Sequence, residues 1–290
     1  MSKWTAADMV DQTGRHVIIT GANSGLGAAC ARELARAGAS VLLACRNVAK
    51  GESAAAQMSG DVEVRQLDLA DLSSVRAFAD GVETVDVLVN NAGVMAVPQA
   101  RTADGFEMQI GTNHLGHFAL TGLLLPKLTD RVVTLSSGVH RVGRIDLNDL
   151  NWERRRYRAW AAYGQSKLAN LMFAFELQRR LAAAGSAVRS LAAHPGYAAT
   201  ELQSHTESVL DRVMVIGNRL IAQPADRGAL PALYAAAVAD IAGGSFVGPD
   251  GLGELTGHPR LVGSSKASRD EAVAARLWTL SERLTAVTYL

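Results

Sequence analysis

Cysteine is scarce in this sequence of 290 residues, which contains only Cys30 and Cys45. Both lie in apolar or alanine-rich patterns, so we interpret them as small buried residues and not as a disulfide framework. A chain without disulfides suggests a reducing compartment. We therefore expect a cytoplasmic protein.

Long apolar runs and an excess of charge are also missing. No stretch reaches the roughly 18 apolar residues that a membrane helix needs, and residues 1–15 lack the apolar core that a signal peptide would have. The formal net charge is only +1, so no global field attracts nucleic acid or an anionic membrane. We expect neither of these partners, and a small molecule as the ligand.

The sequence does contain a regular alternation of short apolar runs and helical patterns. The apolar runs lie at residues 16–20, 41–45, 62–67, 86–89, 131–135 and 188–193. Short apolar runs separated by helices are typical of a parallel sheet that is covered on both faces. The sequence predicts a doubly wound parallel α/β sheet, a Rossmann fold, in a single domain over residues 1–290.

The remaining segments give less regular patterns. We expect one long helical segment over residues 105–128, a small helical lid at about 198–222 and an alanine-rich helix at 224–238. The C-terminal extension, about 243–290, contains many Gly and Pro residues and is interpreted mostly as loop, with a short strand at 245–247 and a final helix at 269–284.

Polar motifs follow several of the predicted strands directly. The carboxyl ends of parallel strands meet at one edge of such a sheet, which is where ligands bind. Groups that are scattered from residue 20 to residue 200 are therefore expected to converge.

The first of these motifs is a glycine turn, Thr20-Gly21-x-x-x-Gly25-x-Gly27, between the first strand and the first helix. Glycines let backbone amides approach a pyrophosphate, and the helix that follows directs its N-terminal amides at the same anion. The turn predicts a dinucleotide site.

Arg46 follows the second strand, at the position where NAD-preferring enzymes tend to have an acid that binds the ribose 2′-hydroxyl. A guanidinium suits a 2′-phosphate instead, and Ser24 can add a donor. We expect NADP(H) in preference to NAD(H), with NAD still possible. The alternative is that Arg46 is a solvated loop cation.

Tyr163 and Lys167 lie four residues apart in a helical pattern, so both project from one face. An ammonium group beside a phenol favours the phenolate and lowers the pKa of the phenol. We expect Tyr163 to be a general acid or base.

Taken in order, Thr20-Gly21-x-x-x-Gly25-x-Gly27, Asn91-Ala92-Gly93, Ser137 and Tyr163-x-x-x-Lys167 resemble the short-chain dehydrogenase/reductase family over about residues 14–240. The wording of residues 113–118 and 166–170 is most similar to its retinol-dehydrogenase-like and protochlorophyllide-reductase-like branch. The resemblance implies hydride transfer between nicotinamide and a substrate carbon.

The resemblance also implies a role for each motif residue. The implied catalytic residues are Asn113, Ser137, Tyr163 and Lys167: Tyr163 exchanges the proton, Lys167 lowers its pKa and holds the nicotinamide ribose, Ser137 donates to the substrate oxygen, and Asn113 holds a relay water. With the glycine turn and Arg46, the expected cofactor-binding set is Gly21, Asn23, Ser24, Gly25, Leu26, Gly27, Arg46, Asp68, Leu69, Asn91, Ala92, Gly93, Tyr163, Lys167, Pro195, Gly196, Tyr197 and Thr200.

Ser137 lies 26 residues before Tyr163. Many family members have about half this separation, so the resemblance implies an inserted loop here, as in the retinol-dehydrogenase-like branch. The match of residues 135–140 to that branch favours Ser137 over Ser136. The resemblance makes a homodimer through the helices of Asn113 and Tyr163 possible, although related proteins can be monomeric.

Two weaker patterns have more ordinary explanations. His114 and His117 are three residues apart on a helix, but no third ligand follows with suitable spacing, so we expect no metal site. Four arginines at 154–158 are interleaved with aromatic residues and could bind an acidic partner. A solvated loop whose aromatic residues pack on the domain is the preferred interpretation.

Three functions remain open from the sequence. The leading one is NADP(H)-dependent oxidation of an alcohol or reduction of its carbonyl, with an apolar substrate suggested by the predicted lid, Met95 and Trp160. The second is reduction of an activated carbon–carbon double bond. The third is a non-catalytic NADP-binding sensor or scaffold.

Overall fold

The computed structural model describes residues 3–197 and 223–289. The predicted lid at 198–222, including Thr200, lies outside the described residues. The strands are β1 (His16–Thr20), β2 (Ser40–Cys45), β3 (Val62–Gln66), β4 (Val85–Asn90), β5 (Leu128–Leu135), β6 (Arg189–Ala193), β7 (Phe246–Pro249) and β8 (Pro259–Leu261).

These strands form one sheet in the order β3-β2-β1-β4-β5-β6-β7-β8. Strands β1 to β7 are parallel, and only β8 runs antiparallel to its neighbour. The chain begins at the centre with β1, builds one edge through β2 and β3, and returns to build the other edge from β4. The prediction of a doubly wound parallel sheet is confirmed.

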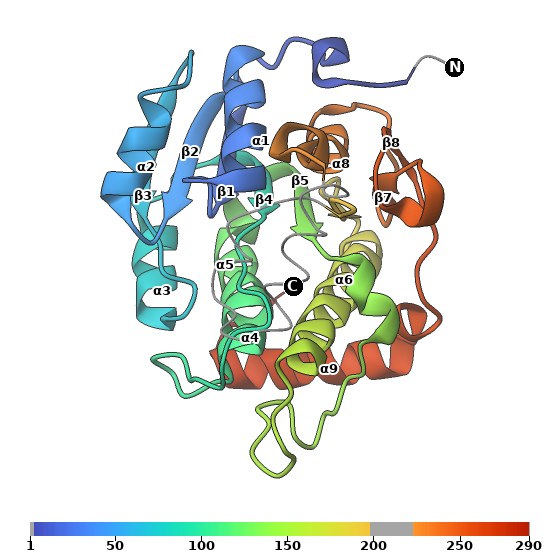
Figure 1. The fold of residues 1–290 in the computed structure, drawn as a ribbon. Coiled ribbons are helices and arrows are strands. Elements are labelled where there is room, and N and C mark those ends of the chain that lie inside the picture. Colours follow the sequence, from blue (N-terminus) through green and yellow to red (C-terminus); the bar gives the residue numbers. More distant parts are fainter. Residues whose placement is uncertain (1–2, 198–222, 290) are drawn as a thin grey trace.

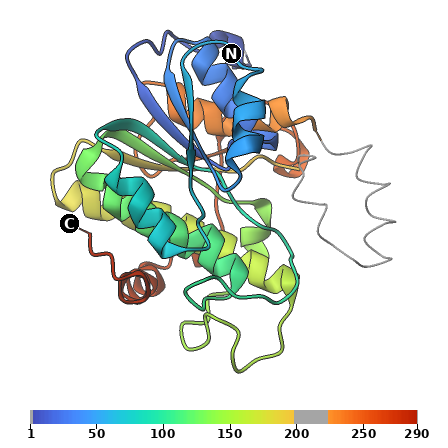
Figure 2. The same ribbon diagram turned by 90° about the vertical axis from the view of Figure 1, so that its left-hand side faces the viewer.

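Helices cover both faces of the sheet (Figures 1 and 2). The helices are α1 (Gly25–Arg36), α2 (Val48–Ala55), α3 (Leu72–Asp80), α4 (Met108–Ile110), α5 (Gly116–Leu124), α6 (Ala159–Ala183), α8 (Ala225–Ala237) and α9 (Glu271–Thr285). A π-helical turn, Gly111–Leu115, joins α4 to α5. Among the described helices, none is both long and apolar enough to cross a bilayer.

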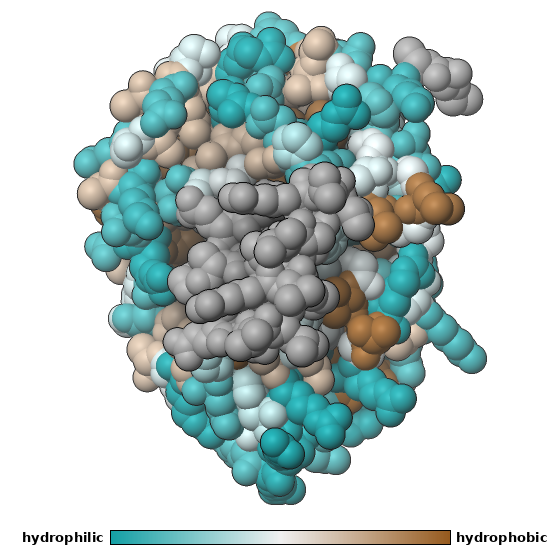
Figure 3. All heavy atoms as spheres, viewed as in Figure 1, coloured by the Kyte–Doolittle hydropathy of each residue, from teal (hydrophilic) through white to brown (hydrophobic). Residues whose placement is uncertain are grey.

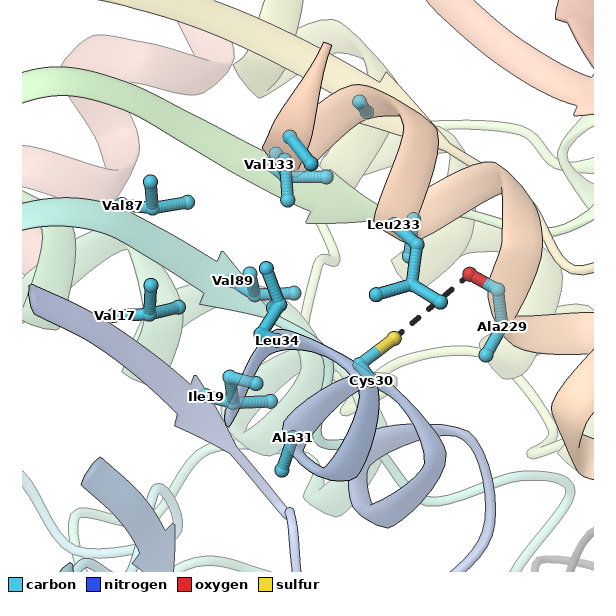
Figure 4. Close-up of a cluster of buried hydrophobic side chains, with 14 of the residues drawn as sticks. Val17, Ile19, Cys30, Ala31, Leu34, Val87, Val89, Val133, Ala229 and Leu233 are labelled. Carbon is cyan, nitrogen blue, oxygen red and sulfur yellow. Dashed lines mark hydrogen bonds between the residues drawn. The ribbon is translucent and has the colours of Figure 1, made fainter. Parts of the chain in front are cut away.

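The alternation of side chains along β1 divides the core between the two faces of the sheet. Val17 and Ile19 pack in a cluster with α1 and α8, whereas Ile18 belongs to the cluster that contains α3, α5 and α6. Figure 4 shows the first cluster, where Cys30 of α1 donates a hydrogen bond to the backbone oxygen of Ala229 in α8 at 3.8 Å. Both cysteines are buried and unpaired.

The C-terminal helix α9 lies across α5 and α6 on the outer side of the second layer (Figures 1 and 2). Trp278 of α9 is buried, and its ring stacks on Phe173 with centroids 5.8 Å apart. Tyr289 donates a hydrogen bond to the backbone oxygen of Phe118 at 2.5 Å. The end of the chain therefore forms part of the main core.

Three local predictions differ from the structure. The helical segment begins at Met108 and not at residue 105, because the Glu107 side chain caps it by accepting from the amides of Gln109 and Ile110. Strand β5 begins at Leu128 because this residue already pairs with Val85. The extension contains the edge strand β8, which sequence patterns missed because it is short and begins with a proline.

Candidate active site

The first turn of α1 has no side-chain cap. Helices α2, α3 and α9 begin with Asn47, Asp71 and Asp270, whose side chains accept hydrogen bonds from first-turn amides. Ser24, at the same position of α1, makes no such bond. The N-terminal amides of α1 at Gly25 to Gly27 are therefore left for a ligand, and the helix dipole favours an anion there.

The glycine turn touches the segment that follows β4. A Cβ atom on Gly27 would lie only 2.5 Å from both Asn91 Nδ2 and the backbone oxygen of Gly21, so residue 27 must be glycine for this approach. Asn91 Nδ2 also donates to the backbone oxygen of Thr20 at 2.7 Å. The structure thus brings two predicted cofactor motifs into direct contact.

His117 connects this contact to the catalytic helices. Thr20 Oγ1 accepts from the amides of Asn91 and Ala92, each at 2.9 Å, and lies 2.8 Å from His117 Nε2. His117 Nδ1 donates to the backbone oxygen of Asn113 at 3.0 Å, so Nε2 is free to accept the hydroxyl proton of Thr20. Burial lowers the pKa of His117 to about 4, which keeps the ring neutral.

Asn113 and Lys167 meet beside Gly93. Asn113 lies in the π-helical turn, a conformation that is frequent at functional sites. Its side chain accepts from the Val94 amide at 2.8 Å and donates to the Val94 oxygen and to Ser166 Oγ, each at 2.9 Å. A Cβ on Gly93 would lie 3.1 Å from Asn113 Oδ1 and 3.5 Å from Lys167 Nζ.

The Ser137 side chain, just after β5, lies close enough to Tyr163 of α6 to lower the pKa of the phenol. Its neighbour Ser136 is buried, and Ser136 Oγ donates to the backbone oxygen of Lys167 at 2.8 Å. Ser137 is therefore the serine that contacts the phenol, whereas Ser136 anchors α6 to the end of β5. We call Asn113, Ser137, Tyr163 and Lys167 the reaction end of the site.

Burial raises the pKa of Tyr163 to about 12, although the Ser137 side chain lowers it. Lys167 Nζ lies 5.8 Å from the centroid of the Tyr163 ring and donates to the backbone oxygen of Leu135 at 3.2 Å. Burial also lowers the pKa of Lys167, to about 8. Burial therefore dominates the pKa of Tyr163 in this structure, and that Lys167 lowers this pKa stays a prediction.

The predicted residues near β2 and β3 lie apart from this cluster. Arg46 is exposed directly after β2, and Lys50 lines a hollow of about 370 Å³ together with Asn23 and Ser24. Among the described residues, the side chains of Arg46 and Lys50 have no ion-pair partner. We call Arg46, Lys50 and Asp68 the adenosine end of the site.

Asp68 and Leu69 follow β3 and differ in exposure. The Asp68 carboxylate is partly exposed and accepts from the Ala70 amide at 2.9 Å. Leu69 is buried in the core beside α5, so its backbone and not its side chain is available to a ligand. The position of Leu26 in the first turn of α1 likewise offers a backbone amide.

The turn Pro195-Gly196-Tyr197 follows β6 at the same edge of the sheet. The Tyr197 amide donates to the backbone oxygen of Leu255 at 2.7 Å, and Gln223 Nε2 donates to the oxygen of Pro195 at 2.7 Å. The C-terminal extension therefore holds this turn from one side. Leu255 and Gln223 were not identified from the sequence, where no motif marks them.

The histidines and arginines singled out from the sequence have structural contacts. His114 is buried and lies 2.9 Å from Ser281 Oγ of α9. No cluster of three or more potential metal ligands occurs in the part of the chain that the structure describes. In the inserted loop, the Arg155 guanidinium lies 3.6 Å from the centroid of the buried Trp152 ring and 3.4 Å from Asp149, so aromatic packing holds this loop.

Comparison with known proteins identifies the family. A family model described as short chain dehydrogenase matches residues 15–210. The chain belongs to the short-chain dehydrogenases. Human retinol dehydrogenase 13 is 45% identical over 93% of this chain and 84% of its own length, and human retinol dehydrogenase 11 is 41% identical over 97% of this chain and 89% of its own length.

A solved structure extends the similarity to the whole fold of this short-chain dehydrogenase. The crystal structure of a protein from Mycobacterium paratuberculosis is 59% identical, covers 100% of both chains and has a TM-score of 0.88. The similarity therefore includes the C-terminal extension as well as the Rossmann core. The resemblance to the retinol-dehydrogenase-like branch is confirmed.

Proposed function

We propose that this protein is an NADP(H)-dependent oxidoreductase that interconverts an apolar alcohol and its carbonyl compound. The observation that carries the proposal is the arrangement of the reaction end, where Ser137 lies beside Tyr163, and Lys167 and Asn113 meet beside Gly93. The reaction end adjoins the segment Asn91–Gly93, and Asn91 of this segment contacts Gly27 in the uncapped first turn of α1. That turn suits the pyrophosphate of a dinucleotide.

A bound nicotinamide dinucleotide would accept or supply the hydride. The residues suited to hold it are those of the glycine turn, the segment Asn91–Gly93 and the turn after β6. The side chains of the reaction end then handle the substrate oxygen: Ser137 Oγ donates a hydrogen bond to it, and Tyr163 takes its proton during oxidation or returns one during reduction.

The proton state of Tyr163 suits the reductive direction. With a pKa of about 12, the phenol keeps its proton at neutral pH, which is the state needed to protonate a carbonyl oxygen. Lys167, whose pKa is lowered to about 8 by burial, can change its own charge near neutral pH and so resupply the proton.

Support for NADP(H) comes from the adenosine end. Arg46 is an exposed guanidinium after β2, and Lys50 and Ser24 line a hollow of about 370 Å³. Among the described residues, no carboxylate pairs with either cation, so both can bind a 2′-phosphate. A titration of the purified protein with NADPH and with NADH tests this preference, and equal affinities would contradict it.

Support for an apolar substrate comes from the exposed side chains. Trp160 is 46% exposed and contacts the Tyr163 ring edge-on, with centroids 6.1 Å apart. Further exposed apolar residues are Val142, Leu252, Leu255 and Leu261, and Figure 3 shows apolar side chains gathered on the right of the face seen in Figure 1. The names of the relatives make retinol and retinal reasonable first compounds.

The test is a screen of alcohols, carbonyl compounds and conjugated alkenes with NADPH or NADP. Turnover of a carbonyl or an alcohol supports the proposal. Turnover of the alkenes alone would favour double-bond reduction, and tight cofactor binding without turnover would favour a sensor.

A cytoplasmic location is part of the proposal because both cysteines are free. A homodimer through α5 and α6 stays a prediction, although α9 already packs on both helices.

A further inference from the structure

One carboxylate of the C-terminal extension lies between the two loops that follow β5 and β6. Glu254 ends a short 3-10 turn, Leu252–Glu254. Arg141 Nη2 donates to both of its carboxylate oxygens at 3.2 Å, and His194 Nε2 lies 3.2 Å from Oε2. Arg141 belongs to the loop after β5, and His194 is the first residue after β6.

His194 connects Glu254 to the turn Pro195–Tyr197 that follows it. Its side chain is only 1% exposed, and its Nδ1 accepts the Gly196 amide at 3.3 Å. The neutral ring therefore carries its proton on Nε2, the nitrogen that faces Glu254. That N–H is not aligned for a hydrogen bond, so the neutral ring meets the carboxylate only as a dipole whose positive end faces the anion. Burial lowers the pKa of His194 to about 4, although Glu254 raises it.

The ring of His194 packs closely against Gly248 of the neighbouring strand β7. A Cβ on Gly248 of β7 would lie 2.1 Å from His194 Nε2, so the ring occupies this position only because residue 248 is glycine. The next residue after Glu254 also contacts the turn, since the Leu255 oxygen accepts from the Tyr197 amide. The extension and the turn after β6 are therefore joined through a side chain and through the backbone.

The Glu254 carboxylate is also linked to the loop after β5 that contains Ser137, which we call the serine loop. Arg141 follows His140, whose Nδ1 donates to the backbone oxygen of Ser137 at 2.7 Å. His140 Nε2 accepts the Ser265 amide at 3.2 Å, so a second part of the extension holds this loop. Glu254 thus joins the loop of the catalytic serine to the turn after β6.

Glu254 occupies an unfavourable backbone conformation. Its φ is 59°, in the left-handed region that glycine and asparagine tolerate best, and the preceding Gly253 has a φ of 62°. A strained non-glycine residue persists where the surrounding contacts hold it, and such positions cluster at functional sites. A glycine would adopt this φ without strain. The presence of glutamate is therefore explained by the contacts of its side chain and not by its backbone.

We propose that Glu254 is a positioning residue for the nicotinamide end of the cofactor, acting through His194 on the turn Pro195–Tyr197 and through Arg141 on the serine loop. This inference rests on the proposed function, which gives that turn to the bound dinucleotide; its link to the loop of Ser137 puts it at the reaction end, where the nicotinamide must lie. Glu254 touches neither Tyr163 nor Lys167 and acts only through the two loops that it joins.

The experiment measures the binding of each dinucleotide with and without its nicotinamide. NADPH is compared with 2′-phospho-ADP-ribose, and NADH with ADP-ribose, by calorimetric titration of the full chain. Glu254→Gly removes the carboxylate and relieves the backbone strain, so the fold is retained. We expect it to weaken binding of the intact dinucleotide about tenfold, the effect of one charge-assisted contact, and to leave the shortened ligands unchanged.

Two further variants sharpen the result. Glu254→Gln keeps an oxygen for Arg141 but loses the charge, so it should restore only part of the affinity. Asp240→Gly is the matched control, because it removes an exposed carboxylate between α8 and β7, outside the two loops that Glu254 joins; it should bind like the wild type. Equal weakening of intact and shortened ligands, or no weakening, would overturn the positioning role. Failure of the wild type to bind either dinucleotide would instead refute the proposed function and, with it, this inference.

Discussion

The two ends of the site are built in opposite ways. At the reaction end, Asn113, Tyr163 and Lys167 are at most 5% exposed, and protein atoms hold the Asn113 side chain by three hydrogen bonds and that of Lys167 by one. At the adenosine end, Arg46 and Lys50 are exposed and, among the described residues, have no ionic partner. One end is fixed before any ligand arrives, and the other is left for the ligand to order.

This difference follows from what each end has to do. Proton transfer needs side chains held within a fraction of an ångström, which packing and hydrogen bonds provide. Recognition of a phosphate at the surface needs only cations that can move to it. The interaction free energy between the cations and the phosphate is then gained on binding. Mutations at the two ends should therefore affect different quantities.

The largest effect is expected from Tyr163→Phe. It removes the proton donor and leaves the ring, so the turnover rate should fall about 1000-fold while the dissociation constant for NADPH stays the same. Steady-state kinetics and a binding titration measure the two quantities. Tyr234→Phe, a change on α8 remote from the reaction end, is the control, and near-normal turnover of Tyr163→Phe would refute the assignment.

Asn113→Ala should destabilise the fold by about 2 kcal/mol, because it leaves the partly buried amide and oxygen of Val94 without partners. Chemical denaturation measures this change. Asn148→Ala provides the comparison, since Asn148 is exposed and should show almost no loss. An equally small loss for Asn113→Ala would mean that the reaction end is not fixed by its own hydrogen bonds.

Lys167→Met should change how stability depends on pH. In the folded chain the pKa of Lys167 is about 8, below the ordinary lysine value of 10.5, so the unfolded chain binds more protons between these values. This group therefore makes the wild type more stable as the pH rises from about 8 to about 10.5, by up to about 3 kcal/mol.

The measurement compares urea denaturation of wild type and Lys167→Met at pH 7.5 and at pH 10. The variant lacks the titrating group. The difference in free energy of unfolding, variant minus wild type, should therefore be larger at pH 7.5 than at pH 10. A constant difference between the two proteins would contradict the lowered pKa of Lys167.

The smallest effect is expected from Arg46→Ala, which should weaken NADPH about tenfold and leave NADH and thermal stability unchanged. Arg36→Ala removes an equal charge at the far end of α1 and should alter neither affinity. A loss of stability in Arg46→Ala would mean that the adenosine end, too, is held by the protein itself.

Local patterns predicted most of the fold. The strand β1, the glycine turn and α1 follow from apolar runs and glycine spacing, because these features act over a few residues. The edge strand β8 was missed, since three residues next to a proline carry no such pattern. The parallel arrangement of the strands followed from general rules and not from any single residue, whereas the order of the strands was not predicted.

Within the site, the sequence predicted which residues take part better than how they behave. The spacing of Tyr163 and Lys167 placed both on one face of α6, but only tertiary packing determines that desolvation raises the pKa of the phenol. Glu254 gave no signal, because it lies in a glycine-rich tail and meets His194 only through the fold. Contacts between distant segments are what the sequence alone does not provide.

The π-helical turn at Gly111–Leu115 has a consequence for insertions and deletions. Such a turn contains one residue more than an α-helical turn, and removing it would rotate everything beyond it by about 100° around the helix axis. His117 would then swing away from Thr20, and Phe118 would leave the aromatic group around Trp278. A family member that has lost one residue here must have rebuilt both neighbourhoods, so the length of this segment is a sensitive marker of common ancestry.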